Sequence, residues 1–167
     1  MLGVRPKWGR WQDGFEITSD RLALFTQTAE TIERRLKQYG KTPNKFGLIH
    51  ADLRLTNLIV EGTKIKVIDF DDCGYGWFLY DLAAALSFLE DKEYVPQLIE
   101  SWLKGYEMIR PLTAEDKNEI PTFIMLRRLL LLAWIGSHSD NDTAQAMGAN
   151  FTYKTVELAK EYLHTFS

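Results

Sequence analysis

Four polar side chains lie within eight residues of this sequence, between two apolar runs. They are His50, Asp52, Arg54 and Asn57, in the stretch LIHADLRLTN. A solvated turn is the usual explanation for a polar loop, but His50 directly follows the apolar segment 47–49, which predicts a buried or half-buried imidazole. A carboxylate and an amide at this spacing offer the oxygen ligands that Mg²⁺ prefers when phosphate oxygens and waters complete its coordination shell.

A second group of carboxylates follows in the segment IDFDD, 68–72. The runs NLIVEG and KIKVIDF, joined by the turn EGTK, predict a β-hairpin between the two polar groups. Because a hairpin brings the outer ends of its strands together, we expect Asn57 and Asp69 to lie side by side, with Asp52 facing the same point. The pattern therefore predicts a Mg²⁺ site at Asn57 and Asp69 and leaves the carboxylate of Asp52 to hold an acceptor hydroxyl.

The elements that position these loops are predicted to be mostly helical. Apolar residues at spacings of three and four over 22–36 indicate an amphipathic helix that begins at Thr18 or Ser19 and stops at Gly40. Thr113 and Asp116 match a capping box at the start of a later helix. The sequence also predicts a short strand over 46–50, helices over 78–90, 95–110 and about 152–165, and a helix opened by Pro121 that carries the apolar run 129–136.

Composition limits the partners. A chain of 167 residues with 46% hydrophobic residues is long enough for one domain with a sizeable core. A net charge of −3, with both signs interspersed, predicts binding neither to nucleic acid nor to an acidic membrane surface. The run 129–136 is far shorter than the roughly 20 residues that span a bilayer, so no membrane partner is expected. The single cysteine, Cys73, makes no internal disulfide, and the absence of a signal peptide at the start of the sequence favours the cytoplasm.

Two segments together resemble a known family. HAD at 50–52 with Asn57, followed by IDF at 68–70, resembles the catalytic and metal loops of protein-kinase-like phosphotransferases, whose patterns are H-x-D-x-x-x-x-N and D-F-G. The closer resemblance is to the aminoglycoside phosphotransferase and choline kinase group of small-molecule kinases, in which a DLA helix follows IDF, as 81–83 does here. The resemblance implies an α+β, mainly α-helical fold: a protein-kinase-like C-terminal lobe with a short β-hairpin that carries the catalytic and metal loops.

The resemblance also implies an ATP-dependent phosphotransferase and the roles of its residues. Asp52 is implied to be the catalytic base, which accepts the proton of the attacking hydroxyl, and Asn57 and Asp69 to be the ligands of a Mg²⁺ ion that bridges the phosphates of ATP. Arg54 occupies the place of a lysine that touches the transferring phosphate, so it is expected to clamp phosphate oxygens unless it is an ordinary surface arginine. His50 is expected to brace the loop rather than to act as an acid or base.

Three further carboxylates are possible members of the same site. Asp71 replaces the glycine of D-F-G and Asp72 follows it, so both are either additional groups at the metal or the acceptor, or members of a solvated turn. Asp81 is implied to fix the backbone of the catalytic loop, unless it caps its own helix. The glycines of CGYG, 73–76, form only a weak nucleotide fingerprint because the third glycine is absent.

No part of a kinase N-terminal lobe is recognised in this sequence. The first 46 residues contain neither a glycine-rich strand-turn-strand nor a strand lysine of the VAIK type. We therefore predict an irregular segment over 1–18 that follows a missing N-lobe, and a single kinase-like domain over 19–167. This chain is expected to bind nucleotide weakly and to be inactive alone, and its exposed lobe interface predicts contact with the missing lobe or self-association.

The acceptor is expected to be a small molecule with a hydroxyl group, of the amino alcohol, amino acid or aminoglycoside type. The helices between about 95 and 138 are the candidates for binding it. For four aromatic residues, a cation–π cage for an ammonium group and an ordinary core role are both open. They are Tyr80, Trp102, Tyr106 and Trp134.

Two other functions are open at this point. A non-catalytic, pseudokinase-like binding module fits the absence of an N-lobe, although the joint retention of Asp52, Asn57 and Asp69 argues against it. A metallohydrolase needs several histidine ligands, and the sequence contains only three histidines in all, far apart from one another.

Overall fold

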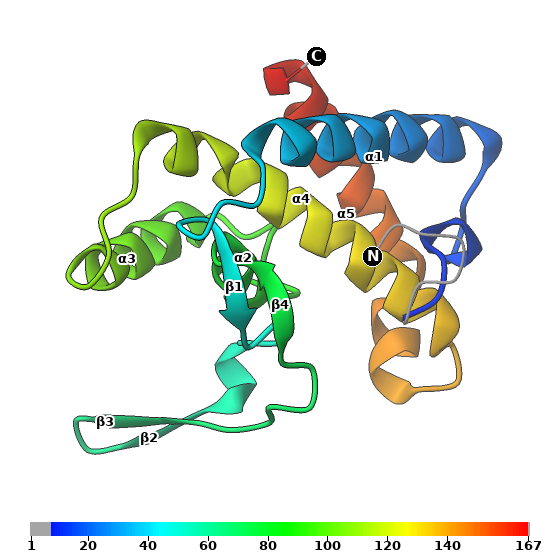
Figure 1. The fold of residues 1–167 in the computed structure, drawn as a ribbon. Coiled ribbons are helices and arrows are strands. Elements are labelled where there is room, and N and C mark those ends of the chain that lie inside the picture. The colour runs from blue at the N-terminus through cyan, green and yellow to red at the C-terminus, as the bar shows by residue number, and fades with distance from the viewer. Residues whose placement is uncertain (1–7, 167) are drawn as a thin grey trace. The chain divides into compact units, whose positions relative to one another are not determined.

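The structure is a computed structural model that describes residues 8–166 (Figure 1). Most of the described chain is helical, and its strands form two small antiparallel sheets, which confirms the predicted α+β, mainly α-helical class. The helices are α1 (Ser19–Tyr39), α2 (Leu79–Ala85), α3 (Val95–Glu107), α4 (Ala114–Ser137) and α5 (Asp142–Phe166). The strands are β1 (Phe46–Ile49), β2 (Leu58–Glu61), β3 (Lys64–Val67) and β4 (Gly74–Trp77).

The chain divides into two compact units. We call them the helical unit (Met1–Lys37 with Met125–Ser167) and the strand unit (Gln38–Ile124). Of the predicted irregular segment 1–18, residues 1–7 lie outside the described residues, and the remainder contains a short 3₁₀ turn, Trp11–Asp13. The predicted single kinase-like domain over 19–167 stays a prediction.

Apolar side chains from three helices form the core of the helical unit. Phe25 and Ile32 of α1, Leu129 and Leu132 of α4, and Phe151 of α5 are all buried. Burial of each such side chain contributes roughly 1.5–3 kcal/mol before the entropy of ordering it is subtracted. The apolar residues of α1 are therefore spaced three and four positions apart because one face of the helix is buried in this core.

Arg128 lies inside this apolar core with its charge satisfied. Its side chain is 1% exposed, Nε donates to Thr155 Oγ1 at 2.8 Å, and Nη2 donates to the backbone carbonyl of Phe151 at 3.1 Å. The guanidinium also lies 3.5 Å from the centroid of the Phe151 ring. A buried charge is tolerated only when it is paired in this way.

α4 is one continuous helix, so the prediction that Pro121 opens a fresh helix is wrong. The predicted capping box is confirmed, because Thr113 Oγ1 accepts from the N–H of Asp116 at 3.1 Å and Asp116 Oδ2 accepts from the N–H of Thr113 at 2.8 Å. An interior proline costs about 3 kcal/mol, and burial of Ile120 and Phe123 on either side stabilises the uninterrupted helix. By length and composition α4 matches a membrane span, but 72% of its apolar window is buried inside the protein, as in a core helix.

α3 ends at Glu107 rather than at 110, and two other helices differ more from their predicted bounds. α5 begins at Asp142 rather than near 152, and Gly148 interrupts it with φ 42° and ψ −140°, a conformation that only glycine adopts readily. α2 ends at Ala85 rather than at 90, and Phe88 beyond it has a left-handed φ of 69°. Both differences occur at residues with unusual backbone angles. The periodicity of apolar side chains in the sequence does not predict such angles.

β1 pairs with β4, a strand that the sequence analysis does not predict. The sheet is antiparallel, with Gly47 opposite Gly76. A Cβ atom at Gly47 would lie 2.8 Å from Phe78 Cζ, and one at Gly76 would overlap Ile49 Cδ1. Gly76 of CGYG thus permits close packing of this sheet, which explains this glycine without a nucleotide.

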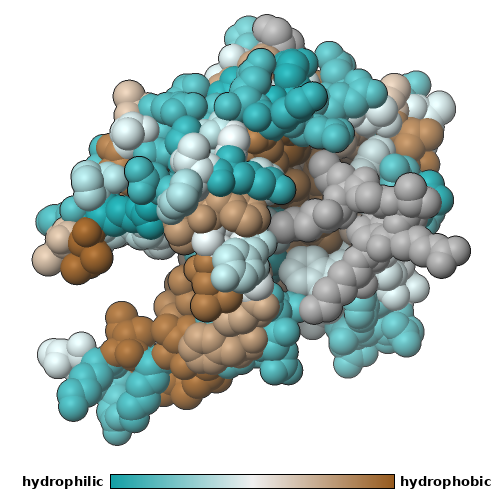
Figure 2. Space-filling model, in the orientation of Figure 1, coloured by the Kyte–Doolittle hydropathy of each residue, from teal (hydrophilic) through white to brown (hydrophobic). Residues whose placement is uncertain are grey.

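β2 and β3 form the predicted hairpin. Leu58 pairs with Val67 and Val60 with Ile65, so these four aliphatic side chains share one face, which we call the hairpin apolar face. Val60 is 69% and Ile65 is 64% exposed. In Figure 2, hydrophobic residues gather at the lower left, where Figure 1 places this hairpin.

A partly buried polar network connects the end of α1 with the start of α4. The hydroxyl of Tyr39 donates to Asp116 Oδ1, and Lys45 Nζ donates to the carbonyl of Tyr39 at 3.1 Å and to Glu115 at 2.6 Å. Burial and the neighbouring Asp116 carboxylate raise the pKa of Tyr39. Burial also raises the pKa of Asp116, but the hydrogen bonds from Tyr39 and Thr113 outweigh it and hold that pKa below its ordinary value. The hydroxyl thus stays protonated and the carboxylate charged.

Candidate active site

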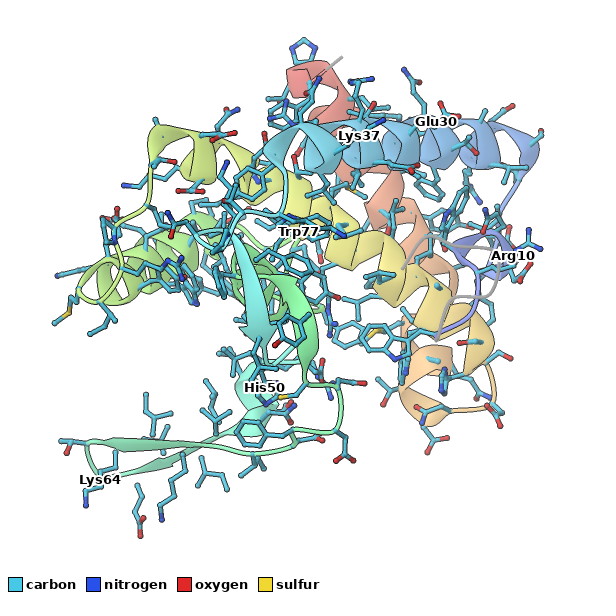
Figure 3. The ribbon with its side chains drawn as sticks, viewed as in Figure 1. Arg10, Glu30, Lys37, His50, Lys64 and Trp77 are labelled. Atoms are coloured by element: carbon cyan, nitrogen blue, oxygen red, sulfur yellow. The ribbon has the colours of Figure 1, made fainter. Side chains whose placement is uncertain are left out.

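The predicted site residues lie in the strand unit, on the loop between β1 and β2 and in the turn after β3. His50 follows β1 directly and lies where that strand meets the hairpin (Figure 3). His50, Asp52 and Asn57 are 7%, 8% and 6% exposed, which confirms the predicted burial of the imidazole. Polar groups this deeply buried need hydrogen-bond partners.

Asp52 fixes the orientation of the Asn57 amide. Asn57 Nδ2 donates to the backbone carbonyl of Asp52 at 2.9 Å and to its Oδ2 atom at 3.2 Å. Both partners are acceptors, so the amide nitrogen must face them and the amide oxygen must point away. Within residues 8–166, no donor reaches that oxygen. Asn57 Oδ1 is therefore available as a ligand.

Asp69 lies one position from its predicted partner. The N–H of Ile68 donates to the carbonyl of Asn57 at 3.0 Å, so Asn57 lies opposite Ile68, and Asp69 is the next residue. The antiparallel register set by the hairpin turn decides this offset. Asp69 is exposed and has a left-handed φ of 65°, which turns the chain out of the strand direction. Its role at a metal stays a prediction.

His50 bridges the two loops in one neutral tautomer. Its Nδ1 accepts from the N–H of Asp52 at 3.3 Å, and its Nε2 lies 3.0 Å from the carbonyl oxygen of Ile68. Because a backbone N–H only donates and a carbonyl only accepts, the ring must carry its proton on Nε2. The ring also packs on Phe70 at a centroid distance of 4.9 Å. These contacts favour the predicted bracing role over acid or base chemistry.

Asp81 holds the backbone of the same loop from α2. Its Oδ2 accepts from the N–H of His50 at 2.9 Å and its Oδ1 from the N–H of Ala51 at 2.8 Å. Ala51 has a left-handed φ of 67°, which costs a residue with a Cβ about 1–2 kcal/mol. The two bonds therefore support the implied bracing role of Asp81 and hold a strained turn that sequence reasoning did not single out.

Arg54 contacts the proposed base. Its Nε donates to Asp52 Oδ2 at 2.9 Å, and the two side chains are 36% and 11% exposed. The structure thus shows Arg54 in contact with Asp52, whereas the resemblance implies that it contacts phosphate. The phosphate role stays a prediction.

Asp71 and Asp72 occupy a turn. The N–H of Cys73 donates to the carbonyl of Phe70 at 3.1 Å, so the two aspartates are the central residues of a β-turn that leads into β4. Asp71 is exposed and Asp72 is half-buried. This arrangement favours the solvated turn that the sequence left open, and their participation in the site stays a prediction.

The oxygen donors fit magnesium better than a transition metal. No three His, Cys, Asp or Glu side chains gather closely enough to hold a metal among residues 8–166. Mg²⁺ does not require such a cage, since it usually binds one or two protein oxygens together with phosphates and waters. The outward oxygen of Asn57 and the exposed carboxylate of Asp69 match that donor set.

The aromatic residues proposed for the acceptor are in different environments. Tyr80 is 2% exposed and belongs to the core. Trp102 and Tyr106 of α3 stack on each other at 4.4 Å, and burial raises the pKa of the Tyr106 hydroxyl. Trp134, in the helical unit, stacks on His138 at 4.8 Å. Tyr80 thus matches the core role that the sequence left open, and a role in acceptor binding stays open for the half-buried pair on α3.

The sequence of this chain is similar to those of known phosphotransferases. The model of the "phosphotransferase enzyme family" matches residues 5–116, which include the loop, the hairpin and α2. Among curated relatives, an amicoumacin kinase of Bacillus subtilis is 29% identical over 136 residues, covering 76% of this chain and 40% of its own length. A homoserine kinase of Neisseria meningitidis is 39% identical over 110 residues, covering 64% of this chain and 35% of its own.

Solved structures show the same fold. A microcompartment-associated aminopropanol kinase superposes with a TM-score of 0.92 and 43% identity, over 98% of this chain and 52% of that one. An amicoumacin kinase in complex with AMP-PNP, Ca²⁺ and Ami superposes with a TM-score of 0.72 and 25% identity, over 94% of this chain and 50% of that one. The predicted kinase-like fold is confirmed, and this chain spans about half the length of these solved relatives.

Proposed function

The chain belongs to the phosphotransferase enzyme family, and from this membership we propose that it supplies the catalytic and Mg²⁺-binding lobe of an ATP-dependent kinase. The acceptor is the hydroxyl of a small molecule, and we propose an amino alcohol. The aminopropanol kinase, which is 43% identical over 98% of this chain, supports that choice. Two of the relatives are named for aminopropanol and homoserine, and each of these compounds carries an amine and a hydroxyl.

One observation carries this proposal. Asp52 and Asn57 are buried together and bonded to each other, and the carbonyl of Asn57 accepts from the residue that precedes Asp69. Sequence motifs separated by a hairpin thus meet in space. Phosphoryl transfer depends mainly on positioning and on neutralising charge, so a few groups fixed in this way suffice.

Each residue has a proposed task. Asp52 accepts the acceptor's hydroxyl proton as the hydroxyl oxygen bonds to the γ-phosphorus and ADP departs with the bridging oxygen. Asn57 and Asp69 hold Mg²⁺, which when bound neutralises charge on the phosphates of ATP. His50 and Asp81 hold the loop backbone in place and do not touch the reacting atoms.

We also propose a partner for the hairpin. The hairpin apolar face receives a complementary lobe that covers the nucleotide, or, in its absence, a second copy of the chain. Four aliphatic side chains on one face, two of them more than 60% exposed, support this interface. Without such a cover the chain alone binds nucleotide weakly and turns over little or none.

Calorimetric titration with Mg²⁺ and AMP-PNP tests the nucleotide site. We expect weak, Mg²⁺-dependent binding that Asp69→Asn abolishes, whereas Glu93→Gln, which removes an exposed charge elsewhere in the strand unit, leaves it unchanged. Binding that is independent of the metal and of Asp69 would refute the proposed site. Nucleotide binding without transfer to any amino alcohol, even with a complementary lobe added, would instead indicate the non-catalytic binding module.

A further inference from the structure

We propose that Arg54 acts as a latch on Asp52. The Arg54 guanidinium binds the Asp52 carboxylate until a polyphosphate arrives, and it then binds the phosphates instead. The proposal rests on the proposed role of Asp52 as the base. It adds a coupling between the arrival of the phosphates and the release of Oδ2, one of the two carboxylate oxygens of Asp52 that can accept a proton.

The oxygen in question is saturated in the structure. Asp52 Oδ2 accepts from Arg54 Nε at 2.9 Å and from Asn57 Nδ2 at 3.2 Å. A carboxylate oxygen has two in-plane lone pairs, so these two donors match the usual acceptor capacity of Oδ2. An acceptor hydroxyl that donates to Oδ2 therefore competes with Arg54 for this oxygen.

Arg54 is the partner that can move. Asn57 is buried and bonded to two oxygens of Asp52, whereas the Arg54 side chain is 36% exposed and uses only Nε. Its two terminal amino groups have no partner among the residues that the structure describes. They are the part of a guanidinium that grips phosphate oxygens in pairs.

The backbone holds the latch in place while its side chain changes partner. The N–H of Arg54 donates to the carbonyl of Asp52 at 2.7 Å, and the carbonyl of Arg54 accepts from the N–H of Asn57 at 2.9 Å. A partly exposed ion pair with one hydrogen bond is weak. A polyphosphate carries several negative charges, so it competes well against a single carboxylate for the same guanidinium.

A double-mutant cycle tests this exchange without catalysis. Binding of inorganic tripolyphosphate, without divalent cations, is measured by calorimetry for the wild-type chain, Asp52→Asn, Arg54→Gln and the double variant. We expect Asp52→Asn to bind about three to ten times more tightly than the wild type, because it frees Arg54. In the Arg54→Gln background the same substitution should change the affinity less than twofold.

An equal gain in both backgrounds would show a general charge effect and overturn the proposal, and so would undetectable binding in every variant. Lys64→Gln is the matched control, since Lys64 lies at the hairpin tip away from His50 (Figure 3) and its loss should leave the affinity within twofold. If Asp52→Asn does not fold, the wild type alone decides the question by NMR. The Arg54 Nε–H resonance, identified by its absence in Arg54→Lys, must shift when tripolyphosphate is added. Failure of the proposed function is seen separately, as absence of Mg²⁺-dependent AMP-PNP binding.

Discussion

The amide of Asn57 donates to the backbone carbonyl of Asp52 at 2.9 Å, and this bond decides which atom of Asn57 faces outward. A side chain at position 57 that lacks a hydrogen-bond donor cannot make this bond, so it is not held in the same orientation. The proposed metal ligand and the proposed base are therefore one structural unit rather than two independent groups, and substitutions at either position should affect both.

Asn57→Asp tests this unit. The variant keeps an oxygen ligand but places a carboxylate against two oxygens of Asp52, so we expect it to lower the free energy of unfolding by about 1–3 kcal/mol. Asn57→Ala, which removes the donor without adding charge, should cost less. Urea denaturation at pH 7 measures both, and an Asn57→Asp variant as stable as the wild type would show that the amide is oriented otherwise.

His50→Phe removes both hydrogen bonds of the imidazole while keeping a planar ring against Phe70. Two backbone groups, the N–H of Asp52 and the carbonyl of Ile68, lose their partners, and we expect a loss of about 1–3 kcal/mol in the free energy of unfolding. His50→Gln, whose Nε2 can still donate to Ile68, should recover part of the loss. If both variants had the same free energy of unfolding as the wild type, the His50 bridge between the loops would contribute nothing to stability.

Ala51→Gly should stabilise the chain slightly. Ala51 has a φ of 67°, where a Cβ costs about 1–2 kcal/mol, and glycine removes this strain at an entropic cost of about 0.5–1 kcal/mol. The net expectation is a gain of up to about 1.5 kcal/mol in the same denaturation experiment. Ala23→Gly, at an exposed position inside α1, serves as the comparison and should lose about 1 kcal/mol. Equal losses in both variants would contradict the strained conformation.

The pair of Tyr39 and Asp116 predicts how stability depends on pH. The lowered pKa of Asp116 means that its contribution is complete above about pH 4, the value of an unfolded aspartate, and disappears as the pH falls through the folded pKa. The raised pKa of Tyr39 means that its contribution is complete below about pH 10 and disappears as the pH rises further.

Tyr39→Phe should therefore lower the free energy of unfolding by about 1.5 kcal/mol at pH 7 and by less at pH 3. Denaturation at the two pH values measures the difference. A destabilisation that is the same at both values would mean that the hydroxyl contributes through packing rather than through the Asp116 carboxylate.

The hairpin apolar face makes a separate prediction about assembly. Val60→Lys places a charge at a side chain that is 69% exposed, so the unfolding free energy should change by no more than about 0.5 kcal/mol. If a second copy covers this face, the variant should also be more monomeric than the wild type in size-exclusion chromatography with light scattering. Lys66→Ala, on the opposite face of the hairpin, should leave the association unchanged. A wild-type chain that is monomeric at high concentration would exclude the second copy as the cover.

The sequence alone was sufficient for the features that depend on near neighbours. The helix over α1, the Thr113 and Asp116 capping box and the β2–β3 hairpin all arise from interactions between residues a few positions apart, so their residue types and spacings predict them. The spacing of HAD, Asn57 and IDF also identified the family, because that pattern is set by which residues a phosphate-transferring loop requires.

Tertiary structure decided what depends on residues far apart in the chain. β4 exists because β1 lies beside it and two glycines allow their close approach, and α4 continues through Pro121 because its buried side chains outweigh a lost hydrogen bond. The tautomer of His50 follows from Ile68, eighteen residues away, and the loop conformation from Asp81, thirty-one away. No local pattern encodes these contacts, since the free energy that fixes them is gained only when the folded chain brings the partners together.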